Sequence, residues 1–243
     1  MFHLETQTPL AAGPEGFPRR GGRAYLPGAA LREALLTAAL AYAIRRDEAF
    51  AAEMRRLAQH AFKGSVAGLS EAMTQALLER QPELASLNPG DVLLGTPEEH
   101  GVRWLDTWQG EPDREERVEW IEGRFPLDDD LPPELATWLA TSCRSYADAL
   151  ATAERAALIP VVPAAEPFYQ ELKSRTLKGS AWPLRVGYWT PEPEGGRFVA
   201  FARLVTASKA LERRFQARPL PRHLLYDPVR ARSLGWALLQ KEA

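Results

Sequence analysis

Hydrophobic and polar positions alternate near the two ends of this chain and follow a helical period between them. Residues 2–10 alternate with a period of two, which predicts a strand that ends at Pro9. Apolar positions over 29–57 recur at the 3.6-residue spacing of an amphipathic helix, and 69–81 repeat that spacing after a break. We therefore expect residues 29–81 to be almost entirely helical.

The second half of the chain predicts strands, then helices, then strands again. The patterns indicate strands at 101–108 and 116–128, helices at 132–158 and 166–177 (a helical region over 132–177), a β-hairpin made of 182–189 and 197–205, and a final strand in "SLGWALL" (233–239). The sequence thus predicts a mixed α+β fold, in a single domain over 1–243 with a strand-rich part at 182–243.

Composition narrows the possible functions. The hydrophobic fraction of 45% and the net charge of −2 are those of an ordinary globular protein. The single cysteine, Cys143, excludes an intrachain disulfide and is expected to fill a small space on a helix. Four scattered histidines have no metal-ligand spacing, so we expect no metal, no cofactor and no catalytic constellation. No signal peptide or bilayer-spanning stretch is visible, which favours a cytoplasmic location.

Charge is distributed unevenly along the chain. Between Glu98 and Glu134 there are thirteen acidic residues and four arginines, whereas between Arg203 and Arg232 there are eight basic residues and two acidic ones. This asymmetry fits one face that meets RNA and another that meets protein, and it fits two solvated surfaces equally well. The run Asp128–Asp130 could bind Mg²⁺, but a solvated acidic turn is the favoured interpretation.

The junction at Pro27-Gly28 is the strongest candidate for a binding site. It separates a possible short strand (23–27) from the start of the first helix, where free N–H groups and the helix dipole attract anions. Arg32 lies in the first turns of that helix, and further arginines precede it on a segment (11–22) that we expect to be a mobile loop. The hypothesis is a contact to the sugar-phosphate backbone of a single strand, and the alternative is an ordinary start of a helix.

Two segments carry a resemblance to a known family. "TPLAAG" (8–13) and "YLPGAALREAL" (25–35) resemble the N-terminal signature of the RAMP superfamily of CRISPR proteins. The matching positions are Thr8, Pro9, Leu10, Gly13, Tyr25, Leu26, Pro27, Gly28, Leu31, Arg32, Ala34 and Leu35. Segments 102–108, 116–128, 145–158, 168–172 and 219–239 resemble, in order, parts of the terminal RAMP subunit of type III-A (Csm) effector complexes.

The resemblance implies a ferredoxin-like (RRM-like) RAMP fold, an antiparallel sheet with a large helical insertion, in which the first and last strands share a sheet. It implies an RNA-binding structural subunit that caps an antiviral ribonucleoprotein filament, binds the 3′ part of the CRISPR RNA and contacts target RNA and adjoining RAMP backbone subunits. The subunit would support CRISPR RNA maturation and target-RNA interference, and it would not be an enzyme, because target cleavage belongs to the backbone subunits. The residues expected to contact RNA are Arg19, Arg20, Arg23, Tyr25, Pro27, Gly28, Ala29, Arg32, Arg185, Trp189, Arg222 and His223.

The sequence departs from the family pattern at three places. Ala29-Ala30 replace a Ser-Ser pair, Glu33 replaces a glycine, and the second glycine-rich loop is reduced to "RVGYWTPEPEGG" (185–196). RNA contact would then depend more on Arg32, Arg185 and Arg222. Trp189, in a predicted turn, is the candidate for stacking on a base, whereas Trp236 is expected in the core.

Three other functions remain open at this stage. A RAMP endoribonuclease that processes precursor CRISPR RNA would use His3 or His223 as general base. A type III-B (Cmr) RAMP subunit would share the fold and differ in its partners. A helical protein–protein adaptor would use residues 29–81 and would not bind RNA.

Overall fold

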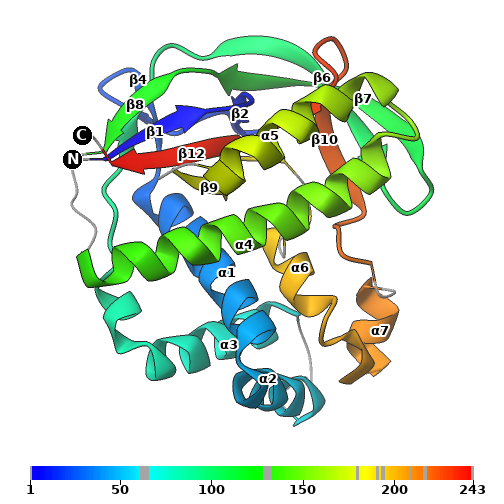
Figure 1. The fold of residues 1–243 in the computed structure, drawn as a ribbon. Coiled ribbons are helices and arrows are strands. Elements are labelled where there is room, and N and C mark those ends of the chain that lie inside the picture. Colours follow the sequence, from blue (N-terminus) through cyan, green and yellow to red (C-terminus); the bar gives the residue numbers. More distant parts are fainter. Residues whose placement is uncertain are drawn as a thin grey trace.

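The fold is an antiparallel α+β arrangement in which helices cover one side of the sheets (Figure 1). The computed structural model describes residues 2–60, 66–127, 133–178, 181–189, 192, 195–207, 209–215 and 218–241. Within these residues the α+β class, the antiparallel sheet and the helical insertion predicted from the sequence are confirmed.

A four-stranded sheet joins the two ends of the chain. Its order is β8 (Arg124–Leu127), β1 (Phe2–Thr6), β12 (Trp236–Lys241) and β9 (Trp182–Arg185), and every neighbouring pair is antiparallel. The pairing of β1 with β12 confirms that the first and last strands share a sheet. Leu4 and Leu239 are partners in this register and are fully buried, because alternate residues of both strands face the helices.

A five-stranded sheet is built around a long hairpin. Its order is β11 (Arg232–Ser233), β10 (His223–Asp227), β6 (Glu98–Asp106), β7 (Glu111–Ile121) and β2 (Leu10–Ala11). The predicted single strand 116–128 is wrong, because β7 and β8 belong to different sheets. The chain turns at Glu122-Gly123 between them, and the residues on both sides of this turn keep their alternation.

A small third sheet lies beside the start of the first helix. Its order is β3 (Arg19–Arg20), β4 (Arg23–Leu26) and β5 (Val92–Leu93). β3 and β4 are joined by Gly21-Gly22, whose φ angles of 56° and 80° suit glycine. The segment expected to be a loop (11–22) therefore carries a short strand.

The helices form the layer below the sheets. α1 (Gly28–Arg46), α2 (Glu48–His60) and α3 (Val66–Arg80) confirm the predicted helical segment, and α4 (Pro133–Leu158) and α5 (Glu166–Lys178) confirm the second helical region. α4 packs on α1 and on β9, and α5 packs on α4 (Figure 1). Cys143 is buried on α4, as expected, and burial raises the pKa of its thiol to about 12. Two short 3₁₀ helices, η1 (Pro82–Ser86) and η2 (Pro163–Ala165), connect these elements.

The second strand of the predicted hairpin is a helix. Residues 197–205 lie in the 3₁₀ helix η3 (Gly195–Arg197), in α6 (Phe198–Phe201) and at the start of η4 (Val205–Ala207), and α7 (Lys209–Phe215) follows. Phe198, Phe201 and Leu204 recur at every third position and are buried, which is a helical spacing rather than the period of a strand. No helix in the described ranges is both long and apolar enough to span a bilayer.

Candidate nucleic-acid interface

The first N–H group of helix α1 is bound by a carboxylate of the chain itself. The Gly28 N–H donates to Oδ1 of Asp91 over 2.9 Å, and the N–H groups of Ala30 and Leu31 donate to the Pro27 carbonyl. The Gly28 N–H, with help from Arg20, holds the pKa of Asp91 below its ordinary value against the opposing effect of burial. Asp91 therefore occupies part of the position that the sequence suggested for a phosphate.

Gly28 is required by packing within the chain. A Cβ atom at this position would lie 1.9 Å from the Pro89 carbonyl oxygen, because the loop that contains Pro89 and Gly90 approaches the helix start closely. Pro27 is half-buried, Gly28 is buried and Ala29 is exposed. The close approach predicted at Pro27-Gly28 exists, but its partner is backbone rather than a ligand.

The arginines around this junction lie close together and are largely paired. Arg19 forms an ion pair with Glu119 and Arg20 forms one with Asp91, each at 2.5 Å. Arg20 also lies over the ring of half-buried Tyr25, 5.1 Å from its centroid. The Nε of Arg32 donates to the Leu87 carbonyl over 2.8 Å.

Arg23 is exposed like Arg19 and Arg20, but unlike them it has no ion pair within the described ranges. The structure thus brings residues 19–32 to one edge, with acids of the chain already bound to part of their charge.

Arg185 and Trp189 were expected to contact RNA, but the structure places both side chains in the core. The side chain of Arg185 is 1% exposed and pairs with Glu154 at 2.8 Å, inside the core. Its guanidinium lies between the rings of Trp189, at 4.5 Å, and Trp236, at 5.0 Å. Trp189 is buried, so neither residue lies on an accessible RNA-binding surface, whereas the core position expected for Trp236 is confirmed.

A buried polar cluster explains why these residues turn inward. Oε2 of Glu154, on α4, accepts hydrogen bonds from the Tyr169 hydroxyl, the Ser233 hydroxyl and the Trp236 indole N–H. Burial lowers the pKa of Arg185, and the charge of Glu154 opposes that effect. The cluster ties α4 and α5 to strands β9, β11 and β12, so its role is to hold the helices on the sheet.

Arg222 and His223 form a separate group beside the five-stranded sheet. Arg222 is 46% exposed and pairs with Asp106 at 2.9 Å, and Asp106 also accepts the N–H groups of Trp108 and Gln109. Nδ1 of His223 lies 2.8 Å from Glu192. His223 is the first residue of β10 and Arg222 directly precedes it, so both belong to a different sheet region from the strands that carry residues 19–26.

The histidines of the endoribonuclease hypothesis lie in different sheets. His3 is buried in β1 of the four-stranded sheet, and Arg124 contacts its Nδ1 at 3.1 Å. His223 is in β10 of the five-stranded sheet. A buried His3 cannot act as a general base on RNA at the surface, which corrects that part of the hypothesis. No group of three or more metal-ligand side chains occurs within the described ranges, and Asp128–Asp130 lie outside them.

Tyr188 is a partly exposed aromatic residue that was not predicted from the sequence as a candidate for stacking on a base. Its half-exposed ring packs on Gly13 and lies edge-to-face with Trp104, 5.6 Å between centroids. Gly187 before it has a φ of 81°, and this glycine conformation turns the chain so that Tyr188 faces outward while Trp189 faces inward. Two adjacent aromatic residues in a strand-like segment signalled that one of them would be exposed, and Trp189 was the wrong choice.

The segments that carry the family resemblance meet at one junction between the sheets. The Gly235 N–H donates to the Pro9 carbonyl, the Val186 N–H donates to Gly235, and the Tyr188 N–H donates to Ala11, over 2.8–2.9 Å. A Cβ at Gly235 would lie 2.5 Å from the Val186 carbonyl oxygen. The N-terminal motif, the reduced glycine-rich loop and the Leu-Gly-Trp motif are therefore parts of one backbone assembly.

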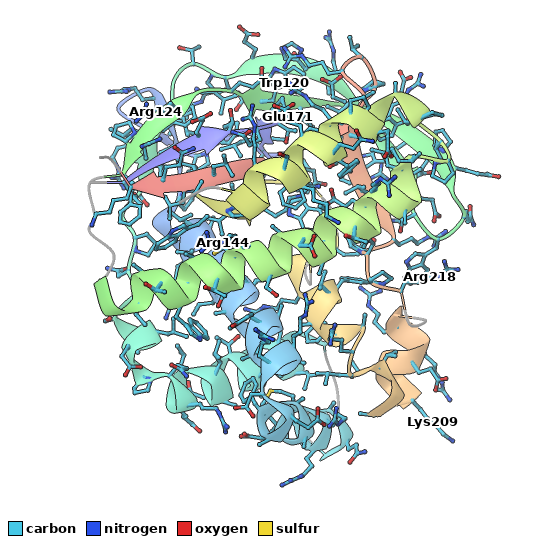
Figure 2. All side chains as sticks on the ribbon, viewed as in Figure 1. Trp120, Arg124, Arg144, Glu171, Lys209 and Arg218 are labelled. Carbon is cyan, nitrogen blue, oxygen red and sulfur yellow. The ribbon has the colours of Figure 1, made fainter. Side chains whose placement is uncertain are left out.

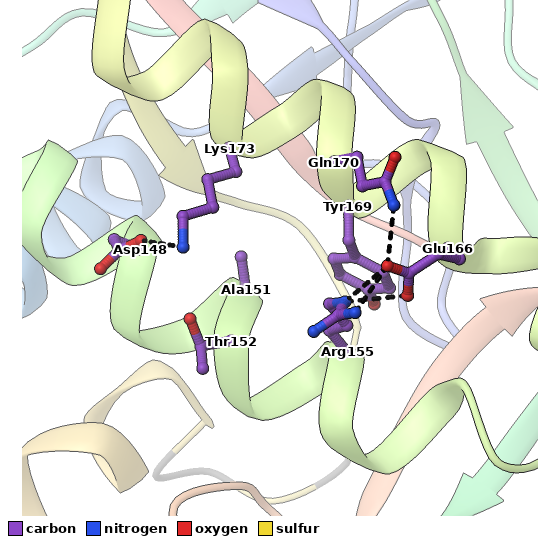
Figure 3. A pocket seen from close by; sticks show the side chains of 8 residues that line it. All are labelled: Asp148, Ala151, Thr152, Arg155, Glu166, Tyr169, Gln170 and Lys173. Carbon is purple, nitrogen blue, oxygen red and sulfur yellow. Dashed lines mark hydrogen bonds and ion pairs between the residues drawn. The ribbon is translucent and has the colours of Figure 1, made fainter.

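A pocket between α4 and α5 is lined by charges that are paired with one another (Figure 3). Its volume is about 240 Å³. Arg155 forms a bidentate contact with Glu166, and Lys173 lies 3.9 Å from Asp148. These pairs hold the two helices together, and we assign no ligand to this pocket.

Comparison with known proteins identifies the fold. No protein-family model matches the chain. An uncharacterized protein of Aquifex aeolicus is 26% identical over 240 residues, which are 97% of this chain and 98% of that protein. Among solved structures, Csm5 of T. onnurineus matches with a TM-score of 0.58 and 16% identity, over 92% of this chain and 73% of that chain. A chain of the Csm–crRNA–target RNA ternary complex of a type III-A CRISPR-Cas system matches with a TM-score of 0.53 and 16% identity, over 93% and 75%. The chain therefore has a fold similar to that of Csm5, which agrees with the fold that the sequence resemblance predicted.

Proposed function

We propose that this chain is the Csm5-type terminal subunit of a type III-A CRISPR effector complex. In this role it is a non-catalytic RNA-binding cap that holds the 3′ part of the CRISPR RNA, contacts target RNA and docks on the adjoining RAMP backbone subunits. It thereby supports CRISPR RNA maturation and target-RNA interference. The observation that carries the proposal is the similarity to Csm5 over 92% of the chain.

Two further observations support this choice among RAMP proteins. The motif segments around Pro9, Val186 and Gly235 form one hydrogen-bonded junction, as expected if they act as a unit. The two solved structures compared above carry the Csm name, which favours type III-A over type III-B. The separation of His3 and His223 into different sheets disfavours the endoribonuclease alternative.

The test is purification of the tagged chain from its native host, followed by sequencing of the bound RNA and identification of the bound proteins. We expect RNAs that share a repeat-derived 5′ tag, together with other RAMP subunits. Random RNA or no RNA, without RAMP partners, would contradict the proposal and favour the protein–protein adaptor. An untagged host treated identically is the control.

The same material tests the absence of catalysis. Incubation with precursor CRISPR RNA in the presence of a chelator should leave the RNA intact. Metal-independent cleavage that His223→Ala abolishes would establish the endoribonuclease instead.

A further inference from the structure

Ion pairs neutralise arginines over much of the described surface. Most of these pairs are exposed, and most join residues from different elements. Examples are Arg19–Glu119, Arg20–Asp91, Arg103–Glu115, Arg155–Glu166, Arg175–Glu171, Arg222–Asp106 and Arg230–Glu122. The residues that the sequence suggested for RNA contact are largely in this paired group.

The segment around α7 has exposed basic side chains without such partners. We call it the α7 basic surface, and it consists of Arg203, Lys209, Arg213 and Arg218. All four are exposed, and none forms an ion pair within the described parts of the chain. The acidic residue within 203–218 is Glu212. Of the eight basic residues between 203 and 232, Arg222, Arg230 and Arg232 are ion-paired with acids of the chain, whereas these four have no such pair within the described ranges.

Buried apolar residues pack the α7 basic surface against the core. Leu204, Val205 and Leu211 are buried under it, and η4 packs against both α7 and α2. Lys209 and Arg218 project from this end of the molecule (Figure 2). Apolar residues therefore face inward and cations face outward, which gives a charged surface on a packed support.

Neighbouring like charges repel, and a bound polyanion relieves this repulsion. Guanidinium groups pair bidentately with phosphate, and an ammonium group binds phosphate as a point charge. A backbone of regularly spaced phosphates satisfies several such groups at once, because each can reach a different phosphate. A single-stranded RNA has this chemistry.

We propose that the α7 basic surface binds the phosphate backbone of single-stranded RNA. This proposal rests on the proposed function for the presence of RNA and adds the surface that holds it. The surface lies at the opposite end of the molecule from β4, so it is separate from the edge formed by residues 19–32 (Figure 1). RNA would bind there independently of its base sequence, since all four contacts are to phosphate.

The test is fluorescence anisotropy with labelled single-stranded RNA and the full chain, over a series of salt concentrations. The variant removes the four charges of the surface: Arg203→Ala, Lys209→Ala, Arg213→Ala and Arg218→Ala. The control removes four other exposed charges: Arg45→Ala, Arg46→Ala, Arg117→Ala and Lys241→Ala. Thermal unfolding followed by circular dichroism checks that both variants fold like the original chain.

We expect the α7 variant to weaken RNA binding by at least about tenfold, and to make the salt dependence of log K less steep by about 0.7 for each phosphate that the variant no longer binds. The control should keep the original salt dependence. Unchanged binding by the α7 variant would overturn this inference and leave the proposed function intact, whereas no RNA binding by the original chain would overturn both. Equal losses of affinity in the two variants would also overturn it, since the effect would then be one of net charge.

The same variant distinguishes RNA from an acidic protein as the partner of the α7 basic surface. The α7 variant and the control are co-purified from the native host with their bound proteins. If the α7 variant keeps its RNA affinity and loses a protein neighbour, the surface binds protein and the RNA assignment is wrong.

Discussion

At the scale of single residues, Asp91 binds the helix start at Pro27-Gly28 where the sequence predicted a phosphate. The helix start attracts an anion, and the chain supplies one from 63 residues away. Arg185 illustrates the same point inside the core, where Glu154 takes the place of a phosphate. In both cases the basic or N–H group predicted to bind RNA has an acidic partner in the chain.

Asp91→Asn should lower thermal stability at neutral pH. The pKa of Asp91 is held below its ordinary value of 3.8, so its ionised form contributes stability above that pH. The contribution is lost as the pH falls below 3.8, through the lower pKa of the folded state. Melting curves at pH 7 and pH 3 should therefore show a difference from the original chain that shrinks in acid. Exposed Glu111→Gln is the control, and an equal loss at both pH values would point to packing instead.

Arg185→Met should destabilise the chain by about 3–5 kcal/mol, because it leaves the charge of Glu154 buried and uncompensated. Adding Glu154→Gln should recover much of this loss, since the amide oxygen still accepts hydrogen bonds from Tyr169 and Trp236. Urea unfolding of the single and double variants measures both effects. RNA affinity at a temperature where the variants are folded should not change. A loss of RNA binding without loss of folding would mean that Arg185 contacts RNA.

At the scale of elements, strongly periodic segments could be predicted from the sequence and ambiguous ones could not. The 3.6-residue period located α1, α4 and α5, because one face of each helix is apolar. The run 197–205 is short and mostly apolar, so its periodicity does not separate strand from helix. The alternation over 116–128 hides the turn between β7 and β8, since both strands have a buried face. The start of α1 was predictable, but its partner Asp91 is distant in sequence and was not.

Gly28→Ala should disturb the start of α1. The added Cβ would meet the Pro89 carbonyl oxygen, so the loop or the helix must shift, and we expect a loss of about 1–3 kcal/mol. Gly101→Ala is the matched control, because nothing lies within 4 Å of its Cβ position. Urea unfolding gives the stabilities, and amide exchange shows whether the change is confined to the first turns of α1. Similar losses for both variants would mean that the close approach is not the cause.

At the scale of the whole molecule, an acidic hairpin lies beside the segment that follows α7. The β6–β7 hairpin carries exposed Glu111, Asp113 and Glu115, and its end contacts residues 220–222, since the Thr107 hydroxyl donates to the Pro221 carbonyl and Asp106 pairs with Arg222. A polyanion that approaches the α7 basic surface is therefore repelled by the neighbouring hairpin and attracted by the four cations. The charge distribution thus steers RNA to approach α7 from the side away from the hairpin.

Neutralising the hairpin tests this orientation effect. We expect Glu111→Gln, Asp113→Asn and Glu115→Gln together to raise the association rate constant for single-stranded RNA by about two- to fivefold at low salt, because long-range repulsion decreases. Loss of the exposed Arg103–Glu115 pair should have little effect on stability. Stopped-flow measurements at low salt and at about 1 M salt, where the Debye length is about 3 Å, should show the increase only at low salt. A slower dissociation rate would instead mean that the hairpin touches the bound RNA, and an unchanged association rate at low salt would mean that the hairpin does not steer it.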